Sequence, residues 1–429
     1  MNERNLFMKI NPISILSTIL LVGLFSCAAY NYSVSNRNVA YIYQSGKSTL
    51  NPEFLVYHIS DTSSSLFFKI NANELTFIAA KETAEEISKI KIHYQIISSL
   101  DSYELIDSAS TILLINKANI SEIFISYIPL TIPDKSKYNI EIVTTDLLRN
   151  EKKHSFLTID KLNKFSRQNF LLKLNNEVYF KNHLIEGEKF SINCTRNHFE
   201  NIYISYFSKT FPHPYPPFSI INPKSFSFVA DSVWTIPNQD YFSFELKYNG
   251  MYHFRIDSTK KDGITLFNYD EYFPEFKTAN KMIDPLIFIT SKKEMKQLLE
   301  FGNPKLAIDS FWLKKSGNIN RAKQLISVYY SRAKYSNIYF SSYQEGWKTD
   351  RGMIYSIFGE PSTIYKSNKN ERWIYGNSNS DYSLDFTFNK VQNTFSENDY
   401  VLIRNDIYKN SWYKAIETWR DGRIYSIGK

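Results

Sequence analysis

The feature that most restricts the fold is an alternation of apolar and polar residues with period two. It recurs from about residue 51 to residue 280, for example over residues 66–70, 90–96, 190–194 and 201–206. Because successive side chains of a strand point to opposite faces, this pattern is typical of strands with one buried face. It predicts antiparallel sheets that pack face to face.

The spacing of these strands divides the stretch into two units. We expect one antiparallel, Ig-like β-sandwich over residues 49–162 and a second one over residues 163–280. Within the second, residues 211–218 contain four prolines in eight positions. Proline cannot donate to a sheet, so this segment is expected as an exposed polyproline-like loop. Such a loop fits either a recognition segment or a stiff connection.

From residue 281 the pattern changes to a mixture of helices and strands. Ser291 is a suitable N-cap for a helix that Gly302 ends, and helical spacing of apolar residues predicts a long helix up to Phe340. Strand-like segments at 372–375 and 384–388 precede a closing helix over 411–420. The whole chain is therefore predicted to be multidomain and mostly β, with an α+β domain over residues 281–429.

The N-terminus has the parts of an export signal. Arg4 and Lys9 precede an apolar run from Ile13 to Phe25, which is too short for a membrane span of about 20 residues. The following Ser26-Cys27 resembles the bacterial lipobox, in which the cysteine is acylated. We expect a lipoprotein signal peptide over residues 1–26, lipidation of Cys27 and a tether over residues 27–48. A signal cleaved elsewhere and an uncleaved anchor helix are the alternatives.

The residues after Cys27 bear on the destination of the chain. No aspartate stands beside Cys27 and no acidic run follows it. This pattern resembles that of lipoproteins sorted to the outer membrane and facing the periplasm, which is the location we expect, with Cys27 as the membrane contact. The tether and the sandwiches would then lie nearest the membrane and the last domain farthest from it.

Positive charge is concentrated in the last third of the chain. The chain has 51 basic and 43 acidic residues, of which residues 281–429 hold 23 basic and 15 acidic ones. Such a field favours anionic partners such as lipid head groups, an anionic glycan or an acidic protein surface. A solvated basic face without a partner is the alternative. Nucleic acid is not expected, because no run of lysine and arginine is dense enough.

Residues 346–355, which begin Gly346-Trp347-Lys348-Thr349-Asp350-Arg351-Gly352, resemble the signature of the GWxTD-domain family. Phe311-Trp312, Phe358-Gly359-Glu360-Pro361 and Glu371-Arg372-Trp373 extend the likeness, which covers roughly residues 281–429. The resemblance implies a bacterial envelope protein with a β-rich N-terminal part. It implies no particular reaction, because the family has no settled biochemical activity.

The motif has a structural interpretation. Gly346 can adopt backbone angles closed to other residues, and Trp347 can bury a large ring. Thr349 or Asp350 is a good N-cap for a short helix over 351–358. Arg351 would pair with Asp350 or with a strand carboxylate such as Asp385.

The motif also has a functional interpretation. Asp350, Arg351 and Glu360 would line a cleft with Trp347 and Trp373 and bind a sugar or an anionic group. Two carboxylates about 5 to 10 Å apart could also serve glycoside hydrolysis.

Histidine is missing where the motif lies. All seven histidines occur at or before His253, so the last domain has no histidine for a metal site or a general base. We expect no cofactor and no metal. The leading hypothesis is a non-catalytic, lipid-anchored binding or scaffolding protein of the cell envelope that recognises a protein or glycan partner through its basic last domain. The alternatives are a carbohydrate- or peptidoglycan-acting enzyme using Asp350 and a second carboxylate, and a structural subunit of a secretion or motility assembly.

Overall fold

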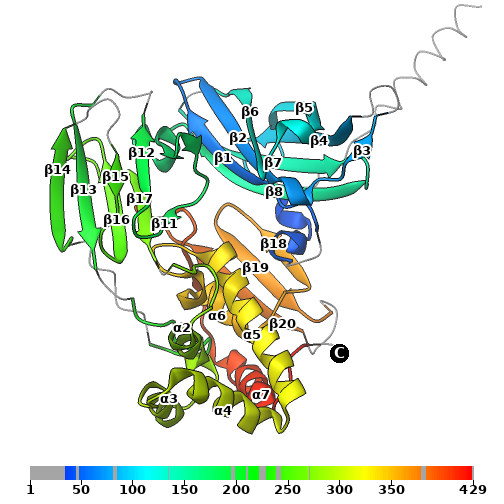
Figure 1. The fold of residues 1–429 in the computed structure, drawn as a ribbon, viewed down its shortest axis with the longest axis vertical. Coiled ribbons are helices and arrows are strands. Elements are labelled where there is room, and N and C mark those ends of the chain that lie inside the picture. Colours follow the sequence, from blue (N-terminus) through cyan, green and yellow to red (C-terminus); the bar gives the residue numbers. More distant parts are fainter. Residues whose placement is uncertain are drawn as a thin grey trace, which may run out of the picture.

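The computed structural model describes residues 34–427 except for 45–47, 81–84, 134, 195–198, 209–210, 222–228, 238–242, 270 and 378–382. The expected signal peptide and Cys27 lie outside the described residues. Figure 1 shows two β-bodies, coloured blue to cyan and green, above a helix-rich body coloured yellow to red. Within the described part, none of the helices is long and apolar enough to span a membrane.

The first body is a β-sandwich of two antiparallel sheets. Its strands are β1 (Glu53–His58), β2 (Ser63–Asn71), β3 (Ile78–Ala79), β4 (Glu86–Ile97), β5 (Leu105–Asn116), β6 (Ile123–Thr131), β7 (Lys137–Asp146) and β8 (Glu151–Asp160). One sheet has the order β1-β2-β6 and the other β3-β4-β7-β8, with β5 also paired to β4. Ile90, Ile92, Tyr94 and Ile96 alternate along β4 and are buried in one core with residues of both sheets. The period-two pattern is therefore confirmed in this body.

The second body is also a sandwich with its own core. Its strands are β9 (Leu171–Leu174), β10 (Glu177–Val178), β11 (His183–Leu184), β12 (Lys189–Asn193), β13 (Asn201–Phe207), β14 (Ser232–Pro237), β15 (Phe244–Glu245), β16 (Gly250–Arg255) and β17 (Ile264–Asn268). The sheets have the orders β10-β9-β12-β15 and β11-β17-β16-β13-β14, and a single core joins them. The short β11 pairs with β17 in parallel, unlike the other pairs of this sandwich.

The C-terminal body mixes helices with an antiparallel sheet. Its elements are α2 (Ala279–Ile283), α3 (Lys292–Leu299), α4 (Pro304–Ser316), α5 (Ile319–Phe340), η7 (Gly346–Lys348), α6 (Asp350–Phe358), β18 (Thr363–Lys366), β19 (Asn370–Tyr375), β20 (Leu384–Lys390), β21 (Tyr400–Leu402) and α7 (Lys409–Arg420). Ser291 caps α3 as expected, in a reciprocal capping box with Glu294. The prediction of a mostly β chain with a C-terminal α+β region is confirmed.

Part of the segment expected as a tether is packed against the C-terminal body. This segment contains the short helices η1 (Val34–Asn36) and η2 (Ala40–Tyr43), which lie beside β18 in Figure 1. The Val39 amide donates to the Ile364 carbonyl at 2.8 Å. Val39, Ala40 and Tyr43 are buried in the C-terminal core. Their apolar and aromatic side chains make this short stretch able to bury itself, which a polar tether could not do.

Candidate functional site

The two glycines of the motif allow three backbone segments to approach closely. A Cβ atom on Gly346 would lie 1.9 Å from the carbonyl oxygen of Ser336 in α5. A Cβ atom on Gly352 would lie 1.9 Å from the carbonyl oxygen of Gly346. Neither glycine has a positive φ. Glycine is therefore required at both positions because space is lacking, and the unusual backbone angles expected for Gly346 are not found.

Thr349 and Asp350 have separate roles at the start of α6. The Thr349 hydroxyl accepts from the Gly352 amide at 3.1 Å and donates to the Gly346 carbonyl at 2.7 Å, so Thr349 is the N-cap. Asp350 binds the Arg404 guanidinium through both oxygens, at 2.5 and 3.1 Å, and accepts from the Leu402 amide at 2.8 Å. Asp350 thus fixes the segment after β21 to the start of α6.

Arg351 lies in a buried polar cluster. Its guanidinium donates to a Glu371 carboxylate oxygen at 3.2 Å and to the Tyr43 hydroxyl at 3.2 Å. It also lies 3.9 Å from the centre of the Tyr400 ring. The side chains of Arg351 and Glu371 are 1% and 0% exposed. The expected partners of Arg351, Asp350 and Asp385, pair instead with Arg404 and Arg372.

Glu371 on β19 is the centre of this cluster. It accepts hydrogen bonds from the Tyr43 hydroxyl at 2.8 Å, from the Trp373 indole at 3.1 Å and from Lys366 and Arg351. Burial alone would raise the pKa of the Glu371 carboxyl, but Lys366 and Arg351 outweigh it and lower the pKa to about 2. Burial and then the Glu371 charge raise the pKa of Tyr43, which therefore remains a hydroxyl donor. The cluster holds one anion among two cations.

The side chain of Trp347, which lies in η7, is almost completely buried. Its ring centre lies 5.3 Å from that of His213 in the proline-rich segment, and 5.9 Å from that of Phe288. Trp373 is also fully buried. The aromatic residues proposed to line a cleft are therefore part of the core.

Glu360 is not brought together with Asp350. The two residues lie at opposite ends of α6, whose nine residues span about 13 Å along the axis. A glycosidase needs carboxylates about 5 to 10 Å apart across an open cleft. The length of α6 separates the backbones of Asp350 and Glu360 by more than this distance.

Two hollows in the described surface lie away from the motif. One of about 570 Å³ is lined by the first sandwich, including Thr62, Asp107 and Pro129. The other, of about 470 Å³, lies between η1 and the β18–β19 hairpin, at Asn36 and Arg372. No residue of the motif lines either hollow. Among the described residues, no three histidine, cysteine, aspartate or glutamate side chains are grouped as a metal site.

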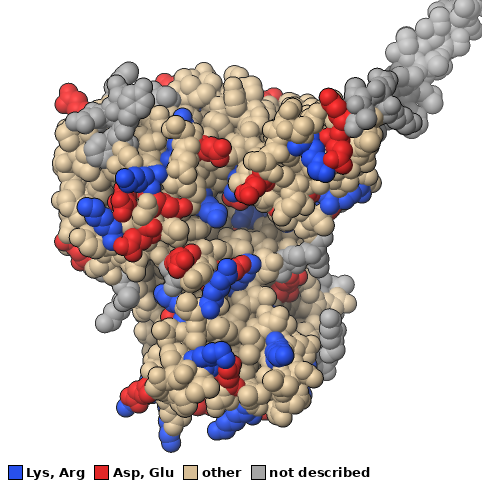
Figure 2. Space-filling model, in the orientation of Figure 1, with Lys and Arg blue, Asp and Glu red and all other residues tan. Residues whose placement is uncertain are grey.

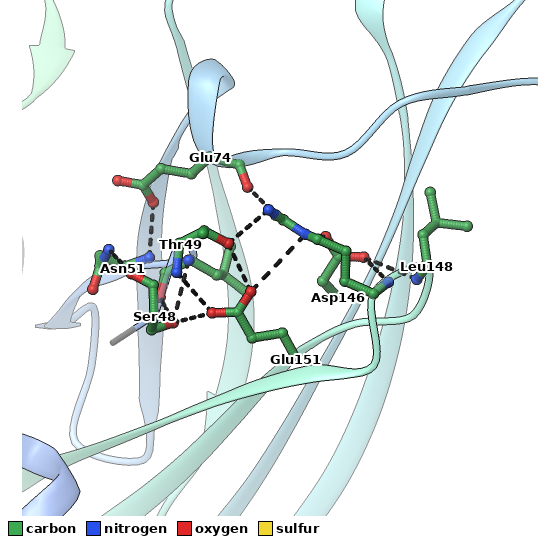
Figure 3. A network of polar contacts seen from close by, with 9 residues as sticks. Ser48, Thr49, Asn51, Glu74, Asp146, Leu148 and Glu151 are labelled. Carbon is green, nitrogen blue, oxygen red and sulfur yellow. Dashed lines mark hydrogen bonds and ion pairs between the residues drawn. The ribbon is translucent and has the colours of Figure 1, made fainter. Parts of the chain in front are cut away.

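A second polar network fixes the start of the first sandwich, as Figure 3 shows. The Glu151 carboxylate accepts from the hydroxyls of Ser48 and Thr49, each at 2.6 Å. Hydrogen bonds from these two residues lower the pKa of Glu151 to about 2. The Arg149 guanidinium donates to the Asp146 carboxylate at 2.7 Å and to the Thr49 hydroxyl at 2.6 Å. This network holds the residues before β1 against the β7–β8 turn, which is a structural role.

The positive charge of the C-terminal body is partly used inside the protein. Arg351 and Arg404 bind carboxylates, and the Arg332 guanidinium donates to the carbonyls of Ile357 and Tyr425 at 2.8 and 3.1 Å. Figure 2 shows basic and acidic side chains interspersed over the face in view, without one continuous basic patch.

Sequence reasoning missed the partners of the motif residues, namely Tyr43, Lys366, Glu371 and Arg404. One signal was present in the sequence. One face of a strand carries Glu371, Trp373 and Tyr375. An acidic residue on the same face as two aromatic residues indicates a buried carboxylate, which needs cationic partners.

The family comparison agrees with the motif. Residues 250–421 match the family model of the GWxTD domain. The C-terminal region thus contains a GWxTD domain, and the match begins in β16 of the second sandwich rather than at the expected boundary of residue 281. A comparison with curated proteins finds no match.

Proposed function

We propose that this chain is a lipid-anchored protein of the bacterial cell envelope with a non-catalytic role, as a binding or scaffolding component that recognises a protein or glycan partner. One observation carries the non-catalytic part. The polar side chains of the motif, Thr349, Asp350 and Arg351, are buried and bonded to other parts of the same chain. Groups held in this way stabilise the fold and are poorly placed to exchange protons with a substrate.

The anchor at Cys27 is supported by the sequence of the export signal. On this proposal the orientation differs from the one expected from the order of the domains. Seven residue steps separate Cys27 from Val34, and an extended chain spans at most about 25 Å over that length. Because the residues that follow dock on the C-terminal body, an anchored chain holds that body close to the bilayer.

The localisation test is Cys27→Ala. The expected result is a soluble protein in the periplasmic fraction with an unchanged melting temperature, whereas the unsubstituted chain sediments with outer membranes. If the variant stayed in the membrane, the anchor would be an uncleaved apolar segment rather than a lipid.

The end of the C-terminal body formed by α3 and α4 is a suitable surface for the partner. Lys292, Lys293 and Lys305 are exposed there, beside Leu299 and Phe301, which are 61% and 48% exposed. Exposed lysines together with apolar side chains fit an anionic partner that also offers apolar contacts.

Recovery of partners from native membranes tests this surface. The lipidated chain should retain an associated protein or polysaccharide, and the double variant Lys292→Glu/Lys293→Glu should lose most of it. Lys260→Glu/Lys261→Glu is the matched control, because these two adjacent lysines are equally exposed on the second sandwich. Recovery of a bare monomer would contradict the proposal, and a large homogeneous complex would favour a structural subunit of an assembly.

One observation bears on the enzyme alternative. Burial raises the pKa of the Asp399 carboxyl, and the charge of the nearby Asp350 adds to the rise. A carboxyl with a raised pKa near a second carboxyl group is a pattern found in acid–base catalysis. Asp350→Asn and Asp399→Asn separate the two roles. An enzyme would lose turnover on cell-wall polysaccharide with its fold intact, whereas we expect no turnover in any of the three proteins.

A further inference from the structure

The proline-rich segment of residues 211–218, called the strap below, lies across the C-terminal body. Three of its rings contact rings of that body. The centres of Phe211 and Tyr343 are 4.8 Å apart, those of His213 and Trp347 are 5.3 Å apart, and those of Phe218 and Tyr413 are 5.3 Å apart. The strap comes from the second sandwich, between β13 and β14, so these contacts join two bodies.

The C-terminal body also binds the strap by its backbone carbonyls. The Arg404 guanidinium donates to the Tyr215 carbonyl at 3.1 Å, and the Asn405 amide donates to the Pro217 carbonyl at 3.0 Å. Proline has no amide hydrogen, so a proline-rich chain offers mainly carbonyl acceptors and ring surfaces. Donors placed between aromatic rings are the features by which proteins recognise such chains.

Residues of the motif form part of the surface that the strap contacts. Trp347 packs against His213, and Asp350 holds both ends of the Arg404 guanidinium, at 2.5 and 3.1 Å. Because the Asp350 carboxylate fixes the Arg404 guanidinium, the N–H group that donates to the strap is oriented toward it before a ligand binds. Asp350 is thus a positioning residue for Arg404.

The contact between the strap and the C-terminal body leaves two polar atoms without hydrogen bonds to any described residue. Arg404 Nε and His213 Nδ1 are both buried and have no hydrogen-bond partner among the described residues. A buried donor without a partner weakens an interaction. A segment of another sequence that offered an acceptor at this point would bind more favourably than the strap.

We propose that Tyr343, Trp347, Arg404, Asn405 and Tyr413 form a recognition groove for a proline-rich peptide with aromatic side chains. The strap is the resident ligand of this groove, and a partner's segment of the same chemistry binds when the strap is displaced. This inference rests on the proposed role as a binding component and specifies its ligand.

The test uses the full chain with residues 211–218 replaced by a glycine–serine linker of equal length. A fluorescein-labelled peptide with the sequence of the strap is titrated against it, and binding is followed by fluorescence anisotropy. The variant should bind the peptide at least tenfold more tightly than the unsubstituted chain, in which the strap competes. Adding Arg404→Gln should weaken binding at least tenfold, whereas Arg372→Gln, at an exposed ion pair with Asp385, should not change it.

A peptide with alanine in place of the four prolines controls for general apolar adhesion. The inference is overturned if a folded variant binds neither peptide, or binds both equally. If the replacement does not fold, the double variant His213→Ala/Phe218→Ala keeps the strap and removes two of its three ring contacts. It should then bind the added peptide more tightly than the unsubstituted chain. Failure of peptide binding while native membranes still yield a partner would remove this inference and leave the proposed function standing.

Discussion

Glu371→Gln removes the one carboxylate of the buried cluster while keeping the shape of the side chain. The glutamine removes the carboxylate that Arg351 and Lys366 both bind and turns an amide group toward these two cations. The side chains of Arg351 and Lys366 are only 1% and 18% exposed, so water cannot replace the lost carboxylate effectively. Loss of one partner from a buried ion pair typically costs about 3 to 5 kcal/mol.

The pKa of Glu371 gives a second route to the magnitude. The pKa falls from 4.5 to about 2 in the folded protein. Each pKa unit corresponds to about 1.4 kcal/mol, so the charged carboxylate contributes about 3 to 4 kcal/mol. The two routes agree in order of magnitude. The expected loss of unfolding free energy for Glu371→Gln is therefore about 3 to 4 kcal/mol at pH 7.

The same carboxylate dictates a pH dependence. Its pKa is lower in the folded than in the unfolded chain, so its contribution is present above about pH 4.5 and is lost as the pH falls toward 2. The difference in unfolding free energy between the unsubstituted chain and Glu371→Gln should therefore shrink across this range.

Denaturant unfolding followed by tryptophan fluorescence measures this difference, because five of the six tryptophans lie in residues 281–429. Glu86→Gln provides the matched control, since its pair with Lys117 is about half exposed on both sides and should cost at most about 1 kcal/mol. A loss below about 1 kcal/mol for Glu371→Gln, or a difference that stays constant from pH 5 to pH 2.5, would refute the reasoning.

Three further changes test local features of the fold. Gly346→Ala should lower the unfolding free energy by about 2 to 3 kcal/mol, because the added Cβ meets the backbone of α5. Gly302→Ala is the control, since nothing lies within 4 Å of a Cβ at that position. It should change the unfolding free energy by less than about 0.5 kcal/mol in the same denaturant titration. Thr349→Ala should cost about 1 kcal/mol through the lost N-cap, and Thr349→Ser should restore most of it; equal melting temperatures of the two variants would argue against the cap. Glu151→Gln should speed hydrogen exchange of the β8 amides at pH 7, and the difference should vanish as the pH falls from about 4.5 toward 2, because the lowered pKa confines the stabilisation to the ionised form.

Local signals in the sequence predicted most of the elements. The pair Ser291 and Glu294 identifies the start of α3 without any knowledge of the rest of the chain, because a capping box closes within one helical turn. The alternation along β4 likewise marks its buried face, since the period of a strand is fixed by its backbone. The presence of a GWxTD domain in the C-terminal region was predicted mainly from ten consecutive residues, whereas the family match begins before the expected boundary of residue 281.

The partners across the fold could not be predicted in this way. The sequence allowed several carboxylates as the partner of Arg351. Glu371 is the partner because of the strand that the folded sheet places beside α6. The strap was recognised as proline-rich, yet its contact with Trp347 depends on how two bodies meet. Sequence spacing does not decide such contacts, because it carries no information on which elements lie side by side in the folded chain.

The docking of Tyr43 on Glu371 also imposes an order on synthesis. The two residues are 328 positions apart, so at about 5 to 20 residues per second the ribosome needs on the order of half a minute to supply the partner. Until then the segment around Tyr43 has no partner on β19, and the core of the C-terminal body stays open. In a product that stops before β19, the segment around Tyr43 has no docking site on that strand and remains accessible to proteases. The contact between Tyr43 and Glu371 thus forms only in chains that include β19.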